Sequence, residues 1–252
     1  MSNDTTRRDF LSVAAAGAAL SILTPQAAMA AEAADSDLMV LPGAFAAEHV
    51  PQPLSFDPAK LNGLSEKLIR SHWENNYGGS VKALNAVKQK LAVFLEDSAL
   101  PAYLYNDLKR EHLLRTGSVV LHELYFGNLG SKGVPDVALR KAIGAAFGSF
   151  ETWEKEFRRI GAGLGGGSGW VTLGLNLHSG RLENYWHGDH AHAPAAALPL
   201  LVLDMYEHSY QMDYGAAAGS YLDAFFRNID WETVALRLEK ALKIVALARR
   251  AA

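Results

Sequence analysis

The sequence predicts an α+β protein, in which an N-terminal antiparallel helical hairpin precedes a C-terminal domain with a small three-stranded antiparallel sheet wrapped by helices. Two long segments between residues 65 and 126 carry apolar side chains at helical spacing. Short apolar runs bounded by turn residues follow between residues 168 and 203 and are typical of strands. Helical periodicity returns from residue 215, so helices and strands are segregated along the chain, as in the α+β class.

The composition describes a globular chain whose metal chemistry, if any, excludes thiolates. The 252 residues (27.3 kDa) are 49% apolar, which supplies a core for one or two domains. The formal net charge is -3 and no basic block is present, which argues against a nucleic-acid partner. The chain contains no cysteine, so disulfides, iron–sulfur clusters and thiolate zinc sites are excluded. Any metal must be held by oxygen ligands or by the nine histidines.

Residues 1–30 predict a twin-arginine signal peptide. The pair Arg7–Arg8 precedes an alanine-rich apolar run that ends at Leu23, and the small residues of Ala28–Ala30 follow. The run is too short and too poor in Leu and Ile to favour a membrane span. We therefore expect the twin-arginine translocase as a transient partner and a periplasmic location for the folded protein. A chance arginine pair or an uncleaved anchor is the alternative. Residues 31–52 are expected to form a flexible tether.

The predicted N-terminal domain covers residues 53–132 and contains the helical hairpin. Its first helix begins near Ser65, and the pairs Asn75–Asn76 and Gly78–Gly79 are expected to kink or break it. The second helix is expected over residues 101–126.

The predicted C-terminal domain covers residues 133–252. Its expected elements are helices 137–147 and 150–160, strands 168–175, 181–186 and 198–203, and helices 215–226 and 231–247. The glycine-rich segment 161–167 invites comparison with a phosphate-binding loop. Such a loop follows a strand and opens a helix, whereas this segment follows a helix and opens a strand, so we reject a nucleotide site there.

Four residues have the chemistry of metal ligands. Asp204 ends a predicted strand and His208 follows four residues later, so both side chains can face one ion. A carboxylate with imidazoles suits Mn, Fe or Zn. His72 and His122 lie on otherwise apolar faces of the two hairpin helices, where a histidine is often only a hydrogen-bonded core residue. Two such histidines beside the Asp204–His208 pair favour a shared ion over a helix cap and isolated core histidines.

A series of short motifs then resembles one known family. In chain order the motifs are Pro53–Pro58, Leu68–His72, Leu84–Asn85, Leu121–Phe126, Phe147–Phe150, Gly167–Trp170, Pro199–His208, Tyr221–Leu222 and Asn228–Trp231. Over roughly residues 50 to 240 the chain resembles the iron/manganese superoxide dismutase family. Any one motif is modest, but their shared order over such a span is specific.

The resemblance implies a superoxide dismutase with one Mn or Fe ion per subunit. His72, His122, Asp204 and His208 match the four protein ligands, and a water or hydroxide is the fifth. Superoxide would be converted to O₂ and H₂O₂. Glu207 matches the residue that bonds the His208 of the other subunit, which implies a homodimer or a dimer-based tetramer.

The residues expected around the ion depart from the family pattern. Trp170 matches the aromatic wall beside the metal. Asn76 and Ser80 stand where the family usually has a histidine and a tyrosine, and Gln211 replaces a tyrosine contributed by the facing subunit. Tyr206 replaces a tryptophan. We assign these five residues to the substrate channel and the surroundings of the metal.

The glutamine that usually contacts metal-bound solvent is also missing. Ser118 occupies its first possible position, and the second falls near Gly188. His187 or His190 could replace it as a donor. Alternatively, the three loop histidines, which include His192, are merely solvated, or they form an auxiliary surface metal site.

The same departures leave two other functions open. One is a non-enzymatic metal-holding protein on this fold, and the other is an oxidase or peroxidase that uses the same ion. The positions that usually distinguish Mn from Fe are replaced, so either ion is expected.

Overall fold

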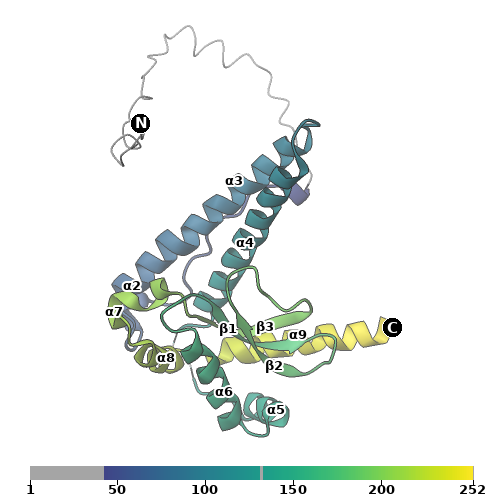
Figure 1. The fold of residues 1–252 in the computed structure, drawn as a ribbon. Helices are drawn as coiled ribbons and strands as arrows, with labels where there is room; N and C mark the ends of the chain where they lie inside the picture. Colours follow the sequence, from purple (N-terminus) through teal and green to yellow (C-terminus); the bar gives the residue numbers. More distant parts are fainter. Residues whose placement is uncertain (1–42, 131–132, 252) are drawn as a thin grey trace, which may run out of the picture. The chain divides into compact units, whose positions relative to one another are not determined.

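The computed structural model describes residues 43–130 and 133–251, and its first half is an antiparallel helical hairpin (Figure 1). The first arm consists of α2 (Glu66–Ser71), a π-helical segment (His72–Tyr77) and α3 (Gly78–Leu95). The second arm is α4 (Ala102–Gly127). The predicted signal peptide and the tether up to residue 42 lie outside the described residues. No described helix combines the length and apolarity needed to cross a membrane.

The expected break in the first arm is replaced by a change of helix type. Between His72 and Tyr77 the backbone forms π-helical turns, and helical geometry resumes directly at Gly78. A π-turn inserts extra backbone into a helix without ending it, and such turns are frequent at functional sites. The prediction of a break was therefore wrong, although it marked the segment that departs from α-helical geometry.

The described end of the predicted tether is bound to the first arm. The backbone of His49 and the side chain of Asn85 exchange two hydrogen bonds, of 3.0 and 2.8 Å. Further along, the Trp73 indole donates to the Gln52 carbonyl at 2.9 Å, and the Gln52 amide donates to the Tyr77 hydroxyl at 2.7 Å. This segment lies against the helix that carries His72.

The second half contains a three-stranded antiparallel sheet with the order β2-β1-β3. The strands are β1 (Trp170–Asn176), β2 (Leu182–His187) and β3 (Ala197–Asp204). In the observed register Trp170 lies opposite His187 on one side and Asp204 on the other. The sheet therefore brings these three residues to one end, and the predicted α+β fold class is confirmed.

Helices pack around this sheet, and two of them form the C-terminal part of the chain. They are α5 (Val137–Phe147), α6 (Phe150–Gly163), the short helices η4 (Glu207–Ser209) and α7 (Gln211–Tyr214), α8 (Ala218–Arg227) and α9 (Trp231–Ala251). Helix α6 packs on β1 and β2, whereas α4 and α9 contact β3. The prediction that α6 ends at residue 160 was wrong by about a turn. Gly161 stays helical, and a Cβ there would lie 2.9 Å from the Leu222 side chain, so glycine permits close approach to α8.

Asn128 joins the two halves just after α4 ends. Its buried side chain accepts from the Val202 amide at 2.8 Å and donates to the Val202 carbonyl at 3.1 Å, so it pairs with β3 as a neighbouring strand would. Arg237 of α9 donates to the same Asn128 oxygen and to the carbonyls of Leu200 and Leu124. The described residues, 43–130 and 133–251, belong to one compact unit.

Candidate metal centre

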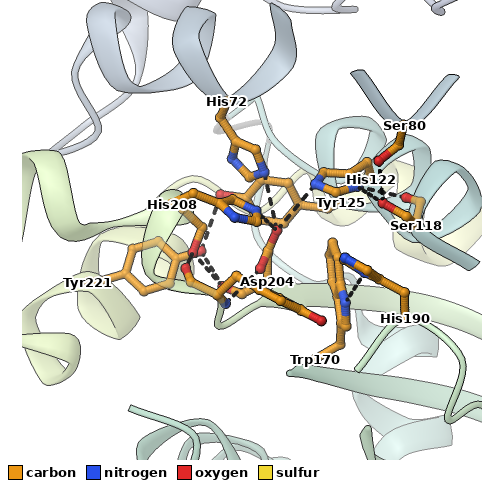
Figure 2. Close-up of polar contacts among 12 residues, drawn as sticks. His72, Ser80, Ser118, His122, Tyr125, Trp170, His190, Asp204, His208 and Tyr221 are labelled. Carbon is orange, nitrogen blue, oxygen red and sulfur yellow. Dashed lines mark hydrogen bonds and ion pairs between the residues drawn. The ribbon is translucent and has the colours of Figure 1, made fainter. Parts of the chain in front are cut away.

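Three imidazoles converge on one carboxylate where the hairpin meets the sheet (Figure 2). His72 begins the π-helical segment, His122 lies on α4, Asp204 ends β3 and His208 lies in η4. The Oδ2 atom of Asp204 is 3.2 Å from Nε2 of His72, 3.3 Å from that of His208 and 3.7 Å from that of His122. The structure therefore brings together the four residues predicted as ligands.

The burial of these groups makes the cluster a site for a cation. The side chains of His72, His122 and Asp204 are buried, and that of His208 is 24% exposed. In the described chain, Nε2 of each of the three histidines and Oδ2 of Asp204 lack hydrogen-bond partners. Buried polar atoms without partners are costly, and those left in a native structure call for an explanation such as an ion. A cation that accepts four lone pairs supplies one here.

The spacing also fits a single ion. Nitrogen and oxygen ligands lie about 2.0–2.2 Å from a first-row metal such as zinc, so two ligands separated by about 90–120° are about 2.8–3.8 Å apart. The three distances to Asp204 fall in or next to this range, and all four ligand atoms lie within 4.8 Å of one another. One carboxylate with three imidazoles suits Mn, Fe or Zn.

The protonation states favour coordination. Burial lowers the pKa of His122 to about 3 and also lowers the pKa of His72, so both imidazoles are neutral near pH 7. Burial alone would raise the pKa of Asp204, but the charges and hydrogen bonds of His208 and His72 together hold that pKa below its usual range. Metal ligands must be deprotonated, and His72, His122 and Asp204 meet that condition.

The surrounding hydrogen bonds aim the ligand atoms. Nδ1 of His122 donates to the Ser118 carbonyl at 2.7 Å, which leaves the lone pair on Nε2. The Tyr206 amide donates to Oδ1 of Asp204 at 2.8 Å, so Oδ2 remains available. The Tyr221 hydroxyl donates to the Asp204 carbonyl at 2.7 Å and fixes the end of β3. This role of Tyr221 was not predicted from the sequence, because no local pattern reveals a hydroxyl that bonds across 17 residues.

An aromatic wall stands beside His122, as expected for Trp170. The Trp170 side chain is fully buried, and its ring centroid lies 5.0 Å from that of His122. Its indole N–H donates to Nδ1 of His190 at 3.0 Å (Figure 2). The His190 ring stacks on Tyr206 at 4.6 Å, and Tyr206 lies over His208 at 5.2 Å. These rings form one side of the site.

The contact with Trp170 settles the tautomer of His190. An indole N–H is only a donor, so Nδ1 of His190 must accept. Burial lowers the pKa of His190, which keeps the ring neutral near pH 7. The remaining ring proton is therefore on Nε2, and the ring centroid lies 5.8 Å from that of His122. His190 consequently carries an N–H donor on Nε2, in a ring that packs near the ligand His122.

The other loop histidines occupy different environments. His187 is buried, with Nε2 3.0 Å from the Thr172 hydroxyl, whereas exposed His192 lies 2.8 Å from Asp189. The alternative that all three are merely solvated is wrong for His187 and His190, because the loop folds against the sheet. An auxiliary surface site finds no support among the described residues, whose sole group of three or more potential ligands is the cluster above.

The remaining residues assigned to the channel differ in burial and in their contacts. Ser80 is buried, and its hydroxyl lies 2.8 Å from that of Ser118, which in turn is 3.3 Å from Nδ1 of His122. This serine pair was missed, although the spacing of Ser118 one helical turn before His122 could have indicated it. Asn76 is half-buried, and Gln211 is exposed on this chain.

A buried cluster of three histidines and one aspartate, between a helical hairpin and a three-stranded sheet, defines a mononuclear metalloprotein. Comparison with known proteins narrows this class.

Residues 135–237 match the C-terminal domain of iron/manganese superoxide dismutases. A superoxide dismutase of Cupriavidus metallidurans, designated Fe, is 54% identical over 192 residues, which make up 76% of this chain and 97% of that protein. One of Aquifex aeolicus, also designated Fe, is 39% identical over 74% of this chain and 89% of its own length. One of Haloferax volcanii, designated Mn, is 31% identical over 77% and 96%. The chain belongs to the iron/manganese superoxide dismutase family.

Proposed function

We propose that this protein is a superoxide dismutase that uses one Fe or Mn ion per subunit. The observation that carries the proposal is the buried cluster of His72, His122, Asp204 and His208, whose inward-facing atoms lack protein partners. Family membership supports the reaction, because relatives that carry this activity in their names align with most of the chain.

The reaction consumes two superoxide ions and two protons and yields O₂ and H₂O₂. When bound, the ion supplies one-electron chemistry, alternating between its divalent and trivalent states. The four ligands would hold it, and the single carboxylate of Asp204 would offset part of its charge in both states. Trp170, Tyr206 and the His190 ring exclude bulk water from one side. The chain must then direct protons to the reacting oxygen atoms.

His190 is the residue that we assign to the role of the missing glutamine. Its Nε2–H can donate to an oxygen atom beside the ion, and its Nδ1 is occupied by Trp170. His187 is less suited, since its ring faces Thr172 within the sheet. The serine pair Ser80–Ser118 fills the other position with small hydroxyls.

The test is to load the chain with Fe or Mn separately and to measure superoxide consumption together with the O₂ and H₂O₂ formed. We expect equal yields of the two products. A loaded protein that consumes no superoxide would point to the non-enzymatic alternative, and peroxide-driven oxidation of other substrates would point to the peroxidase.

His190→Ala should then lower the rate about 10–100-fold, the usual effect of removing an outer partner of a metal site, and shift the metal reduction potential. His190→Gln should restore part of both values. His192→Ala is the matched control, since this histidine is exposed. An unchanged potential in His190→Ala would contradict the assignment.

The second part of the proposal is a homodimer that completes the site. Within the described chain, Nδ1 of His208 has no hydrogen-bond partner, its side chain is the most exposed of the four ligands, and the adjacent Glu207 is exposed. A reciprocal Glu207–His208 contact between subunits would satisfy both residues, as the family resemblance implies. Gln211 would face the partner subunit from the same segment.

The third part is export to the periplasm through the twin-arginine pathway. It rests on the residues around Arg7–Arg8 and Ala28–Ala30. Export of a folded chain would allow Fe or Mn to be bound before the chain meets Cu and Zn, which bind the same ligands more tightly. Arg7→Lys with Arg8→Lys should leave precursor in the cytoplasm, as followed by fractionation. Normal export of this double variant would overturn the proposal.

A further inference from the structure

Helix α4 and the loop that carries His190 meet backbone to backbone at Gly117. A Cβ atom on Gly117 would overlap the His190 carbonyl oxygen and would lie 2.9 Å from the carbonyl carbon. Real Cβ atoms do not approach other atoms so closely, and the obstacle is backbone rather than a flexible side-chain end. Any larger residue at position 117 would therefore displace the loop.

The position of Gly117 in α4 makes this contact notable. Glycine inside a helix is destabilising relative to alanine, because the unfolded chain gains conformational freedom. Gly117 lies in the interior of a 26-residue helix, five residues before His122. Gly79 is also inside a helix, α3, but a Cβ there would meet no atom within 4 Å. A side chain at Gly117 would therefore displace the backbone of His190, whereas a side chain at Gly79 would displace nothing.

The displaced residue would be His190 itself. Its ring is held by the 3.0 Å bond from Trp170 and by stacking on Tyr206, with the two rings 7° from parallel. The loop is braced further along, where Oδ1 of Asp189 accepts from the amides of Ala191 and His192 at 2.7 and 3.1 Å. Gly117 supplies the contact on the helix side.

We propose that Gly117 is a positioning residue, whose missing Cβ lets the His190 loop seat against α4 and so places the His190 imidazole beside Trp170 and the metal ligands. The inference rests on the proposed function in one respect, because the placement of His190 matters for catalysis only if this imidazole donates a hydrogen bond at the metal. The placement itself is a property of the fold and can be measured without catalysis.

The first measurement compares Gly117→Ala with the control Gly79→Ala by NMR. The chain is loaded with Zn²⁺, which is diamagnetic and binds histidine and carboxylate ligands. The Trp170 indole N–H resonance, assigned with Trp170→Phe, reports its bond to His190. We expect a shift of this resonance in Gly117→Ala and none in Gly79→Ala. An unshifted resonance in a folded Gly117→Ala protein would overturn the proposal.

The second measurement asks whether Gly117 acts through His190. In the iron-loaded protein, Gly117→Ala should shift the metal reduction potential and lower the dismutase rate about tenfold or more. Combined with His190→Ala, the same substitution should move the potential no further, because no imidazole remains to be misplaced. Additive shifts in potential would show that Gly117 acts by another route and would overturn the proposal.

A third variant tests the placement of the loop in case the Gly117→Ala protein does not fold. Asp189→Ala loosens the same loop from its other end and adds no atom near α4. It should shift the Trp170 resonance in the same direction, and an unshifted resonance would overturn the proposal. None of the zinc measurements depends on superoxide chemistry, so an inactive wild-type enzyme would count against the proposed function alone.

Discussion

Asp204 both makes hydrogen bonds that fix the local fold and presents a carboxylate oxygen to the candidate metal centre. Its carbonyl accepts from the hydroxyls of Tyr221 and Ser209, and its Oδ1 accepts from the Tyr206 amide. The remaining oxygen, Oδ2, faces the three imidazoles. Because every other acceptor of the residue is used, a substitution can remove the negative charge with little change to the local fold.

Asp204→Asn should accordingly lose most of the bound Fe or Mn while keeping the bond from Tyr206. An ion that binds only the native state stabilises it by mass action, by about 4 kcal/mol when the free ion is about 1,000 times Kd. We expect elemental analysis to find the metal missing and calorimetry to find a lower Tm. The exposed residue Asp107 gives the control variant, Asp107→Asn. Full metal occupancy in Asp204→Asn would refute the ligand assignment.

The second prediction concerns His187 and the dependence of stability on pH. Burial, assisted by the charge of His192, lowers its pKa to about 4, against an ordinary value near 6.5. The unfolded chain therefore binds a proton below pH 6.5 while the folded chain does not, so stability falls as the pH falls from 6.5 to 4. The loss amounts to at most about 3 kcal/mol.

His187→Gln should flatten that part of the stability curve, because glutamine stays neutral and can still bond Thr172. Denaturant unfolding between pH 4 and 7 measures it. The exposed His178 gives the control, His178→Gln, which should retain the wild-type slope. Identical slopes in the two variants would mean that His187 is not buried in its neutral form.

At this scale the sequence was sufficient to select the four residues that the structure brings together, but it did not reveal the roles of their neighbours. His72, His122, Asp204 and His208 stand in motifs whose order is diagnostic, so pattern alone could select them. The role of His190 depends on a loop that folds back onto Trp170 and Gly117, contacts that span 20 and 73 positions along the chain. Local spacing carries no signal for such a contact, which is why the sequence left His187 and His190 as equals.

At the scale of elements, the periodicity located most helices and all three strands, because their apolar faces are buried in one core. The strand register then placed Trp170 opposite Asp204. What the sequence could not predict were changes within a helix. The π-helical turns after His72 and the helical Gly161 depend on packing against other elements, whereas glycine and asparagine are read locally as breaks.

The prediction at this scale concerns Asn128, because its side chain hydrogen-bonds the end of α4 to β3. Asn128→Ala would leave the amide and carbonyl of Val202 buried without that partner, and each such group costs about 1–3 kcal/mol. We expect a loss of about 2–5 kcal/mol in the free energy of unfolding, measured by urea denaturation. The exposed Asn75, which bonds only within its own helix, gives the control Asn75→Ala. A loss below about 1 kcal/mol in Asn128→Ala would contradict this account of the junction.

At the scale of the whole molecule, the metal centre is a tie between the two halves of the chain. His72 and His122 come from the hairpin, whereas Asp204 comes from the end of β3 and His208 from η4. A bound ion therefore stabilises the arrangement of the halves as well as the local site. Among the described residues His208 is the most exposed of the four ligands, so it is the ligand whose surroundings a partner subunit can complete.

The last prediction follows from that ligand and tests the proposed dimer. Glu207→Ala would remove the carboxylate that we assign to the His208 of the partner subunit, so each substitution removes two contacts in a symmetric dimer. We expect sedimentation to detect a shift toward monomer, and we expect metal affinity to fall about 10–100-fold because His208 loses its outer partner. The exposed Glu96, at the far end of α3, gives the control Glu96→Ala, which should remain dimeric and fully loaded. A Glu207→Ala protein with an unchanged dimer and unchanged metal affinity would show that Glu207 does not hold the partner's ligand.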